Sequence, residues 1–260
     1  MDNEIDNIET IKCIKCNADN LPNNKYCNKC GKKIIIDLFE FQKDKIFDNS
    51  IRLIIIIYFI MLLVLFINHY KSDKVDIHPI TWDIIWGSVF IVFTSVFTYL
   101  NWKNIKPIVS MTKLNLKICF GVVVISIVWA FFVFHYVDLI HRTFNVAIEK
   151  ETIKFYGFTS NEYLFVYLIF TNALVPGITE ELIMRGVLYN YLKNVVNEKS
   201  VIYVTAFLFT ITHFNLISAT WIIFNGIFYG FLRYKTNNLL YSIIGHTTHN
   251  IVVSFLMIYY

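Results

Sequence analysis

Residues 53–70 read LIIIIYFIMLLVLFINHY and contain no Asp, Glu, Lys or Arg. A helix of about 20 apolar residues crosses the hydrocarbon core of a bilayer, so this stretch predicts a membrane span. Five more uncharged runs follow along the chain: Ile84–Trp102, Ile118–Val137, Tyr163–Thr179, Ser200–Leu232 and Thr236–Tyr260. The run from 200 to 232 is too long for one span and predicts two helices that meet around Asn215–Ser218. The sequence therefore predicts seven spans.

The composition agrees with a membrane location. Of 260 residues, 56% are hydrophobic and 16% are charged, and the mean hydropathy is +0.54. A soluble domain carries about 25% charged residues. This excludes an ordinary cytosolic enzyme, a disordered chain and a nucleic-acid binder with a basic surface. No stretch alternates like a barrel strand, so the predicted fold class is all-α, a polytopic transmembrane helix bundle.

The first fifty residues are polar and differ in kind from the rest. They lack the apolar stretch of a signal peptide. They contain four cysteines with the spacing C-x2-C-x10-C-x2-C: Cys13, Cys16, Cys27 and Cys30. Two such knuckles complete a tetrahedral Zn²⁺ shell, and in a segment with almost no core the metal supplies most of the folding free energy. We expect a small zinc-ribbon module at 1–35, a linker at 36–50 and the transmembrane domain at 51–260.

The second knuckle, YCNKCGK at Tyr26–Lys32, resembles that of a zinc ribbon, whereas the first has Asn17 where ribbons often have Gly. A closed four-cysteine shell makes the zinc structural rather than catalytic. The alternative is that the four cysteines stay free of metal. Cys119 lies alone in an apolar run and is interpreted as a small core residue.

Lysine and arginine predict the orientation in the membrane. They cluster in the N-terminal segment, in the loop after 102, near 193–199 and at 233–235. The opposite loops, around 71–78, 138–162 and 214–218, are charge-balanced or uncharged. The positive-inside rule then places the N-terminus in the cytoplasm and the C-terminus outside a multi-pass cell-membrane protein.

Chemistry in such a chain must come from polar groups at membrane depth, where ionisable residues are costly. In Ile178–Gly186, Pro176–Gly177 is expected to break or restart the helix and Thr179 to cap it. Glu181 and Arg185 are four residues apart, so they share a helix face and can pair. Glu180 projects about 100° away from Glu181, without a local cation, as suits a general base. The alternative is that both acids belong to a salt-bridge network at the membrane edge.

Two later segments add polar groups on other helices. Phe209-x-x-x-His213 puts an aromatic ring and an imidazole on one face, and His246-x-x-x-Asn250 puts two polar side chains on one face of the last helix. A lone histidine on an apolar helix is more often a packing residue. Three helices that each deliver polar groups, with an unpaired glutamate among them, favour a site.

These segments together resemble a known family. Glu180-Glu181-x-x-x-Arg185, Phe209-x-x-x-His213 and His246-x-x-x-Asn250 match, in order, the three motifs of the CPBP intramembrane proteases, also called Abi, which include the CAAX prenyl endopeptidases. The resemblance covers roughly residues 160–256, within a protease core at about 115–260. Each motif is weak alone, and the ordered set is specific.

The resemblance implies an endopeptidase mechanism. Glu180 and His213 would hold and activate a water that attacks the scissile carbonyl, and His246 and Asn250 would donate hydrogen bonds to the oxyanion. Glu181 is counted with the catalytic set, and Arg185 and Phe209 support it. His249 lies outside the motifs and is interpreted as a packing or polar-network residue. Because no H-E-x-x-H cluster is present, we expect no metal in catalysis.

The expected partners are the lipid bilayer and a peptide or membrane-protein substrate, and no nucleic acid. The ribbon either docks a substrate or regulatory protein, or is a stable cap without a partner. Bacterial members of the family are associated with bacteriocin maturation or self-immunity. Two other functions stay open: a catalytically inactive scaffold or immunity factor of the same fold, and a transporter. An inactive member would have lost a motif residue, and a transporter would show inverted halves with interrupted helices in both.

Overall fold

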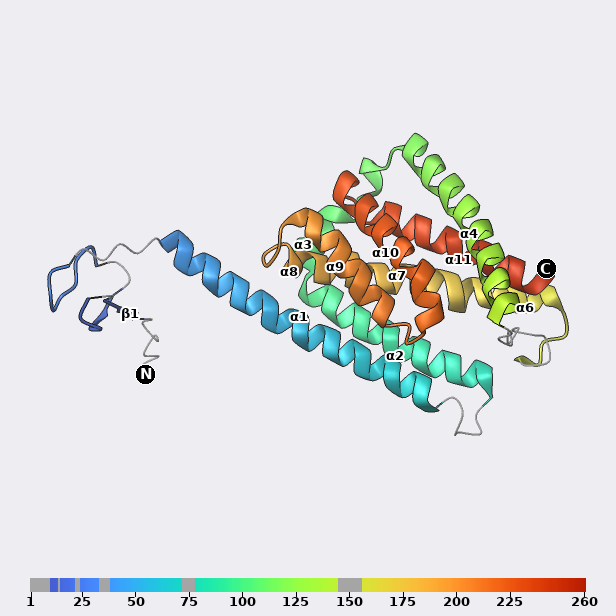
Figure 1. The fold of residues 1–260 in the computed structure, drawn as a ribbon, viewed down its shortest axis with the longest axis horizontal. Coiled ribbons are helices and arrows are strands. Elements are labelled where there is room, and N and C mark those ends of the chain that lie inside the picture. Colours follow the sequence, from blue (N-terminus) through green and yellow to red (C-terminus); the bar gives the residue numbers. More distant parts are fainter. Residues whose placement is uncertain (1–9, 14, 22–23, 33–37, 72–77, 145–155) are drawn as a thin grey trace, which may run out of the picture. The chain divides into compact units, whose positions relative to one another are not determined.

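The computed structural model describes residues 10–13, 15–21, 24–32, 38–71, 78–144 and 156–260. Within these ranges the chain is mostly helical (Figure 1) and forms two compact units, Met1–Arg52 and Leu53–Tyr260. Helix α1 (Leu38–Lys71) begins inside the segment expected to be a linker and continues into the second unit. The expected outer loop around 71–78 falls largely outside the described residues, and the one around 138–162 does so at 145–155.

The first unit contains a two-stranded antiparallel sheet. Strand β1 (Ile11–Lys12) pairs with β2 (Asp19–Asn20), with Ile11 opposite Asn20. Two tight turns carry the four cysteines, and both pass through a left-handed residue, Asn17 at φ 56° and Gly31 at φ 65°. Asparagine tolerates this conformation better than most residues with a side chain, so Asn17 does at the first knuckle what Gly31 does at the second.

The second unit is a helical bundle. After α1, its elements are α2 (Pro79–Leu100), α3 (Trp102–Ile105), η1 (Lys106–Ile108), η2 (Met111–Lys113), α4 (Leu116–Phe144), α6 (Asn161–Leu168), η3 (Ile169–Leu174), α7 (Val175–Glu181), η4 (Leu182–Leu188), α8 (Tyr189–Leu192), α9 (Glu198–Ile211), α10 (Leu216–Thr236) and α11 (Leu240–Tyr259). The long apolar run divides into α9 and α10, and the Asn215 side chain caps α10 by accepting from the Ser218 backbone N–H at 3.0 Å.

Five helices among the described residues are long and apolar enough to cross a membrane: Lys45–Ile67, Pro79–Leu100, Leu116–Phe144, Asn161–Leu192 and Leu216–Thr236. The protein is therefore a multi-pass membrane protein, and length and composition identify five of the seven expected spans. Helix α9 has 14 residues, fewer than this length criterion requires. Helix α11 is continuous, but the polar residues at its centre make it less apolar than the five candidates.

The helix from 161 to 192 does not break at Pro176, as the sequence had predicted. It runs continuously through α7, with π-helical segments, η3 and η4, on either side. The wider π turn before α7 accommodates Pro176, which lacks the N–H that a regular helix would need. Thr179 is therefore not an N-cap, and its hydroxyl instead donates to the Val175 carbonyl at 2.7 Å.

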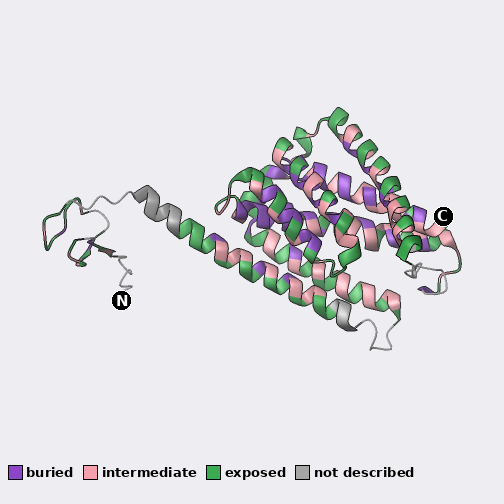
Figure 2. Cartoon of the chain, viewed as in Figure 1, coloured by how far each residue is buried: buried purple, intermediate pink, exposed green. Residues whose placement is uncertain are grey.

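Burial is concentrated in the C-terminal helices (Figure 2). The segment Ile183–Asn190 is buried throughout, whereas α1 and α2 carry mostly exposed and half-buried side chains. The largest apolar cluster joins Ile57 and Met61 of α1 to Ile183, Val187 and Leu188 of η4. Apolar helices with exposed faces are the expected outer layer of a membrane bundle, and the fully buried segment carries Arg185.

Gly226 permits the close packing of α9 against α10. A Cβ atom at this position would lie 2.8 Å from the Ala206 Cα atom, a backbone distance that no side-chain motion relieves. Small residues at helix interfaces allow such close approach of two membrane helices. The Gly226 carbonyl also accepts a hydrogen bond from Arg185, so this contact positions a site residue.

We expect Gly226→Ala to destabilise the bundle by about 1–3 kcal/mol, because the added methyl must push two helix backbones apart. The measurement is thermal unfolding in detergent. Gly87→Ala on α2 is the matched control, since nothing lies within 4 Å of its Cβ position. It should leave the midpoint unchanged or raise it, because Ala favours a helix over Gly. Equal midpoints for the two variants would contradict this packing argument.

Candidate active site and cysteine cluster

A buried ion pair lies at the centre of the second unit. Arg185 Nη1 donates to Glu181 Oε1 at 2.8 Å, and both side chains are 0% exposed. Arg185 Nη2 donates to the Gly226 carbonyl at 2.9 Å, and its guanidinium lies over the Phe209 ring at 4.8 Å. The i, i+4 pairing inferred from the sequence is present, and it extends to two further helices.

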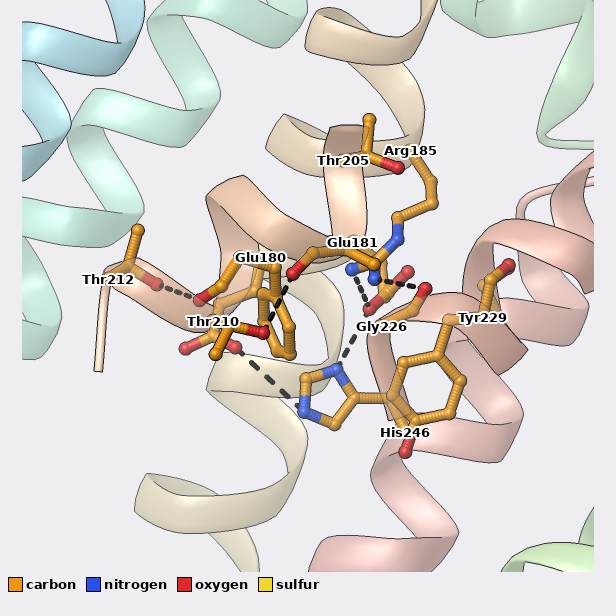
Figure 3. A network of polar contacts seen from close by, with 12 residues as sticks. Glu180, Glu181, Arg185, Thr205, Thr210, Thr212, Gly226, Tyr229 and His246 are labelled. Atoms are coloured by element: carbon orange, nitrogen blue, oxygen red, sulfur yellow. Dashed lines mark hydrogen bonds and ion pairs between the residues drawn. The ribbon is translucent and has the colours of Figure 1, made fainter. Parts of the chain in front are cut away.

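His246 joins this pair from α11. Its Nδ1 lies 3.0 Å from Glu181 Oε1, and its ring stacks on Tyr229 with centroids 4.9 Å apart (Figure 3). A carboxylate only accepts hydrogen bonds, so His246 Nδ1 carries the proton and Nε2 points elsewhere. Glu181 therefore fixes both the orientation and the tautomer of His246.

Glu180 faces the other side of the same imidazole. Its Oε2 lies 3.9 Å from His246 Nε2, and its side chain is 25% exposed, whereas that of Glu181 is fully buried. The two neighbouring glutamates thus have different surroundings: one is neutralised by an arginine, and the other borders open space. The sequence analysis predicts the same difference, with Glu181 paired to Arg185 and Glu180 directed elsewhere.

His213 and Asn250 supply two further polar groups. His213 Nδ1 lies 3.0 Å from the Phe209 carbonyl, which can only accept, so the lone pair of this histidine is on Nε2. Asn250 Nδ2 donates to the Asn172 carbonyl at 2.9 Å and keeps a second N–H. Each side chain is therefore held by a backbone carbonyl, and each has one polar atom left for another partner.

One cavity of about 920 Å³ brings these groups together. Four of the predicted catalytic residues line it: Glu180, His213, His246 and Asn250. Phe209 also contributes to its wall, whereas Glu181 and Arg185 are not among the lining residues. These four motif residues contribute one carboxylate, two imidazoles and one amide, and the wall also contains other polar side chains: His135, Asp138, Arg142, Asn172, Asn215, Ser218, Asn225 and His249. A cavity in which several titratable and amide side chains converge is the first candidate for an active site.

The structure adds residues that the motifs do not identify. Trp129 Nε1 donates to Asn225 Oδ1, and Asn225 Nδ2 contacts His249 Nε2 at 3.3 Å. His249 is thus a polar-network residue, one of the two interpretations left open by the sequence. Tyr229, which stacks on His246, carries no sequence signal beyond its position between Gly226 and Gly230.

The four cysteines of the first unit converge as zinc ligands do. Their ligand atoms all lie within 4.8 Å of one another, with Sγ–Sγ distances of 3.6 Å for Cys13–Cys30 and 3.5 Å for Cys16–Cys27. Tetrahedral Zn²⁺ with Zn–S bonds of about 2.3 Å needs Sγ–Sγ distances of about 3.8 Å. The geometry therefore fits this ion.

Local hydrogen bonds favour the thiolate form of Cys27. Although burial raises the pKa of the Cys27 thiol, hydrogen bonds from the backbone N–H groups of Cys30 and Lys29, and from the thiols of Cys16 and Cys13, together lower the pKa to about 6. The Ala18 N–H lowers the pKa of Cys16, but burial and the neighbouring thiols raise it to about 12. Four thiolates at this spacing repel one another, and a divalent cation removes that conflict.

The fold and the site define a polytopic membrane protein with a cavity of Glu, His and Asn side chains and a separate four-cysteine cluster. Residues 162–252 match the profile of the type II CAAX prenyl endopeptidase Rce1-like family. The chain therefore carries a domain of this CPBP family, as its motifs predicted. No curated protein and no solved structure matches the chain.

For the cysteine cluster we expect one Zn²⁺ per chain after purification without chelator, measured by elemental mass spectrometry. Cys13→Ser/Cys16→Ser should lose the metal, because a shell with two thiolates removed binds Zn²⁺ far more weakly. Cys119→Ser is the matched control, since Cys119 lies outside the cluster, and it should keep the metal. Zinc at full occupancy in the double variant would show that these thiols are not the ligands.

For the ion pair we expect Arg185→Leu to destabilise the bundle by about 3–5 kcal/mol, because it leaves the Glu181 carboxylate buried without a partner. Glu181→Gln/Arg185→Leu should recover part of this loss, since no buried charge then remains. Thermal unfolding of the wild type, both single variants and the double variant gives the coupling energy. Additive losses would mean that the two charges do not stabilise each other.

Proposed function

We propose that this protein is an intramembrane endopeptidase that hydrolyses peptide bonds with a water activated by Glu180. The observation that carries the proposal is the single cavity lined by Glu180, His213, His246 and Asn250. Membership of its domain in a prenyl endopeptidase family supports the same reaction class. The substrate is a peptide or membrane protein that reaches this cavity.

In the proposed reaction Glu180 takes a proton from water as that water attacks the scissile carbonyl. His213 assists through Nε2, whose lone pair is available because Nδ1 is bonded to the Phe209 carbonyl. Glu181 is fully buried and bonded to Arg185, whereas Glu180 lines the cavity where a water can reach it, which favours Glu180 as the base. Glu181 acts as a positioning residue through its bond to His246.

The oxyanion is assigned to His246 and Asn250. Asn250 offers the N–H that is not bonded to Asn172. His246 donates from Nε2 when it enters the reaction as an imidazolium, whose charge Glu181 stabilises, and it keeps this proton throughout the reaction. Glu180 takes one proton from the water and passes it to the leaving amine, so that the peptide bond is cleaved and the Glu180 carboxylate is restored.

The inactive-scaffold alternative predicts a lost motif residue, and every motif residue is present and four line the cavity. A transporter predicts paired inverted halves, whereas the polar side chains of this cavity belong to one half of the chain. Both observations support the enzyme. We further propose that α9 and α11 lie in the membrane as a sixth and seventh helix, with the N-terminus in the cytoplasm. The zinc of the ribbon has a structural role.

The proposal is tested in proteoliposomes with a panel of candidate peptides. We expect Glu180→Gln to lower the cleavage rate by about 10²–10⁴-fold, the contribution of a general base, while the protein stays folded. Cys13→Ser/Cys16→Ser should still cleave, because the ribbon supplies no group to the chemistry. A Glu180→Gln variant as active as the wild type would refute the assigned mechanism.

A further inference from the structure

A second, smaller cavity adjoins the reaction cavity between α4 and α10. It has a volume of about 210 Å³ and is lined by Ile125, Ser126, Trp129, Phe224, Phe228, Tyr229 and His249. His249 also lines the reaction cavity, so the two cavities meet at this side chain. We call the smaller one the side cavity.

The side cavity has an apolar wall that borders the surface of two candidate membrane spans. Ile125 of α4 is 53% exposed and Phe224 of α10 is 57% exposed. In a bilayer these side chains face lipid, because both helices are apolar enough to cross it. The volume accommodates one large apolar side chain.

A chain of hydrogen bonds forms the partition between the two cavities. Trp129 can only donate, so its bond fixes the Asn225 oxygen toward α4 and the Asn225 amide toward His249 Nε2. Asn225 and His249 are 7% and 4% exposed. The partition therefore consists of three side chains from three helices. It can open without the loss of any backbone hydrogen bond.

Helices α4 and α10, which flank the partition, contact each other differently at the two ends of their interface. At one end Val122 of α4 and Leu232 of α10 belong to one buried apolar cluster. Beyond Trp129, the contact between Tyr136 and Trp221 is an edge-on ring contact with centroids 6.2 Å apart. We call this α4–α10 interface the seam. A buried apolar cluster holds it at one end, whereas beside the cavities the contact is made by single aromatic side chains.

We propose that this seam is the lateral access route by which an apolar segment of a membrane-embedded protein substrate enters the reaction cavity, with Trp129, Asn225 and His249 as its latch. The inference rests on the proposed function for the identity of the occupant. The side cavity receives an apolar side chain from the bilayer, and release of the Trp129–Asn225 bond joins the side cavity to the reaction cavity.

The test measures access without requiring catalysis. Full-length, zinc-loaded protein in nanodiscs carries Cys119→Ser and a reporter, Val133→Cys. Val133 is buried, lines only the reaction cavity of the two and lies one turn after Trp129. Alkylation at this position is followed by peptide mass spectrometry, with a bilayer-soluble maleimide in one arm and a charged, membrane-impermeant thiol reagent in the other.

Trp129→Phe removes the latch donor and keeps an aromatic ring. We expect alkylation by the apolar reagent to accelerate about fivefold, as the loss of one net hydrogen bond predicts, with the charged reagent unaffected. Asn225→Leu should give the same result. Trp86→Phe is the matched control, because Trp86 Nε1 is buried without a hydrogen-bond partner among the described residues.

Latch variants that react like Trp86→Phe overturn the proposal, as does equal acceleration with both reagents, which indicates general loosening. A cleavage assay separates this result from the proposed function. Glu180→Gln abolishes cleavage if the protease assignment is right, but leaves alkylation at the reporter unchanged. Faster apolar alkylation in a protein that cleaves nothing would support the access route and count against the enzyme.

Discussion

The Glu181–Arg185 ion pair is the interaction on which the rest of the site depends. Both charges are fully buried, so neither can be left alone without a cost of several kcal/mol. Arg185 meets this constraint by contacting Glu181, the Gly226 carbonyl and the Phe209 ring at once. Each of these groups comes from a different helical segment, so one guanidinium fixes the relative position of η4, α9 and α10.

The same pair assigns different roles to two adjacent glutamates. Glu181 Oε1 accepts from both Arg185 and His246, so its charge serves to orient an imidazole. Glu180, about 100° further around the helix, points into the cavity instead. Two adjacent carboxylates are therefore divided into one that is bonded to an arginine and one that lines the cavity, because the arginine lies four residues after the second glutamate.

Sequence reasoning reached the parts of the site that depend on local spacing. The Glu181–Arg185 pair, the distinct environment of Glu180 and the convergence of four cysteines all follow from short spacings in the sequence, the longest being the ten residues between the two cysteine knuckles. It failed at Pro176, because a π-helical turn, which depends on packing against other helices, lets the helix continue. It could not identify the Trp129–Asn225–His249 chain, because its members are separated by 24 or more residues.

Length and hydropathy identify five of the seven expected spans, and the two helices that they leave out, α9 and α11, carry residues of the candidate site. Hydropathy detects helices that face lipid, and α1 and α2 carry their apolar residues largely on exposed surfaces. Helix α11 buries Ser242, His246 and His249 against other helices, where their hydrogen bonds replace those of water. The apolar helices around α11 thus permit polar residues at its centre. These residues lower the mean hydropathy by which a membrane span is recognised. The helix least recognisable as a membrane span is accordingly one that carries much of the proposed chemistry.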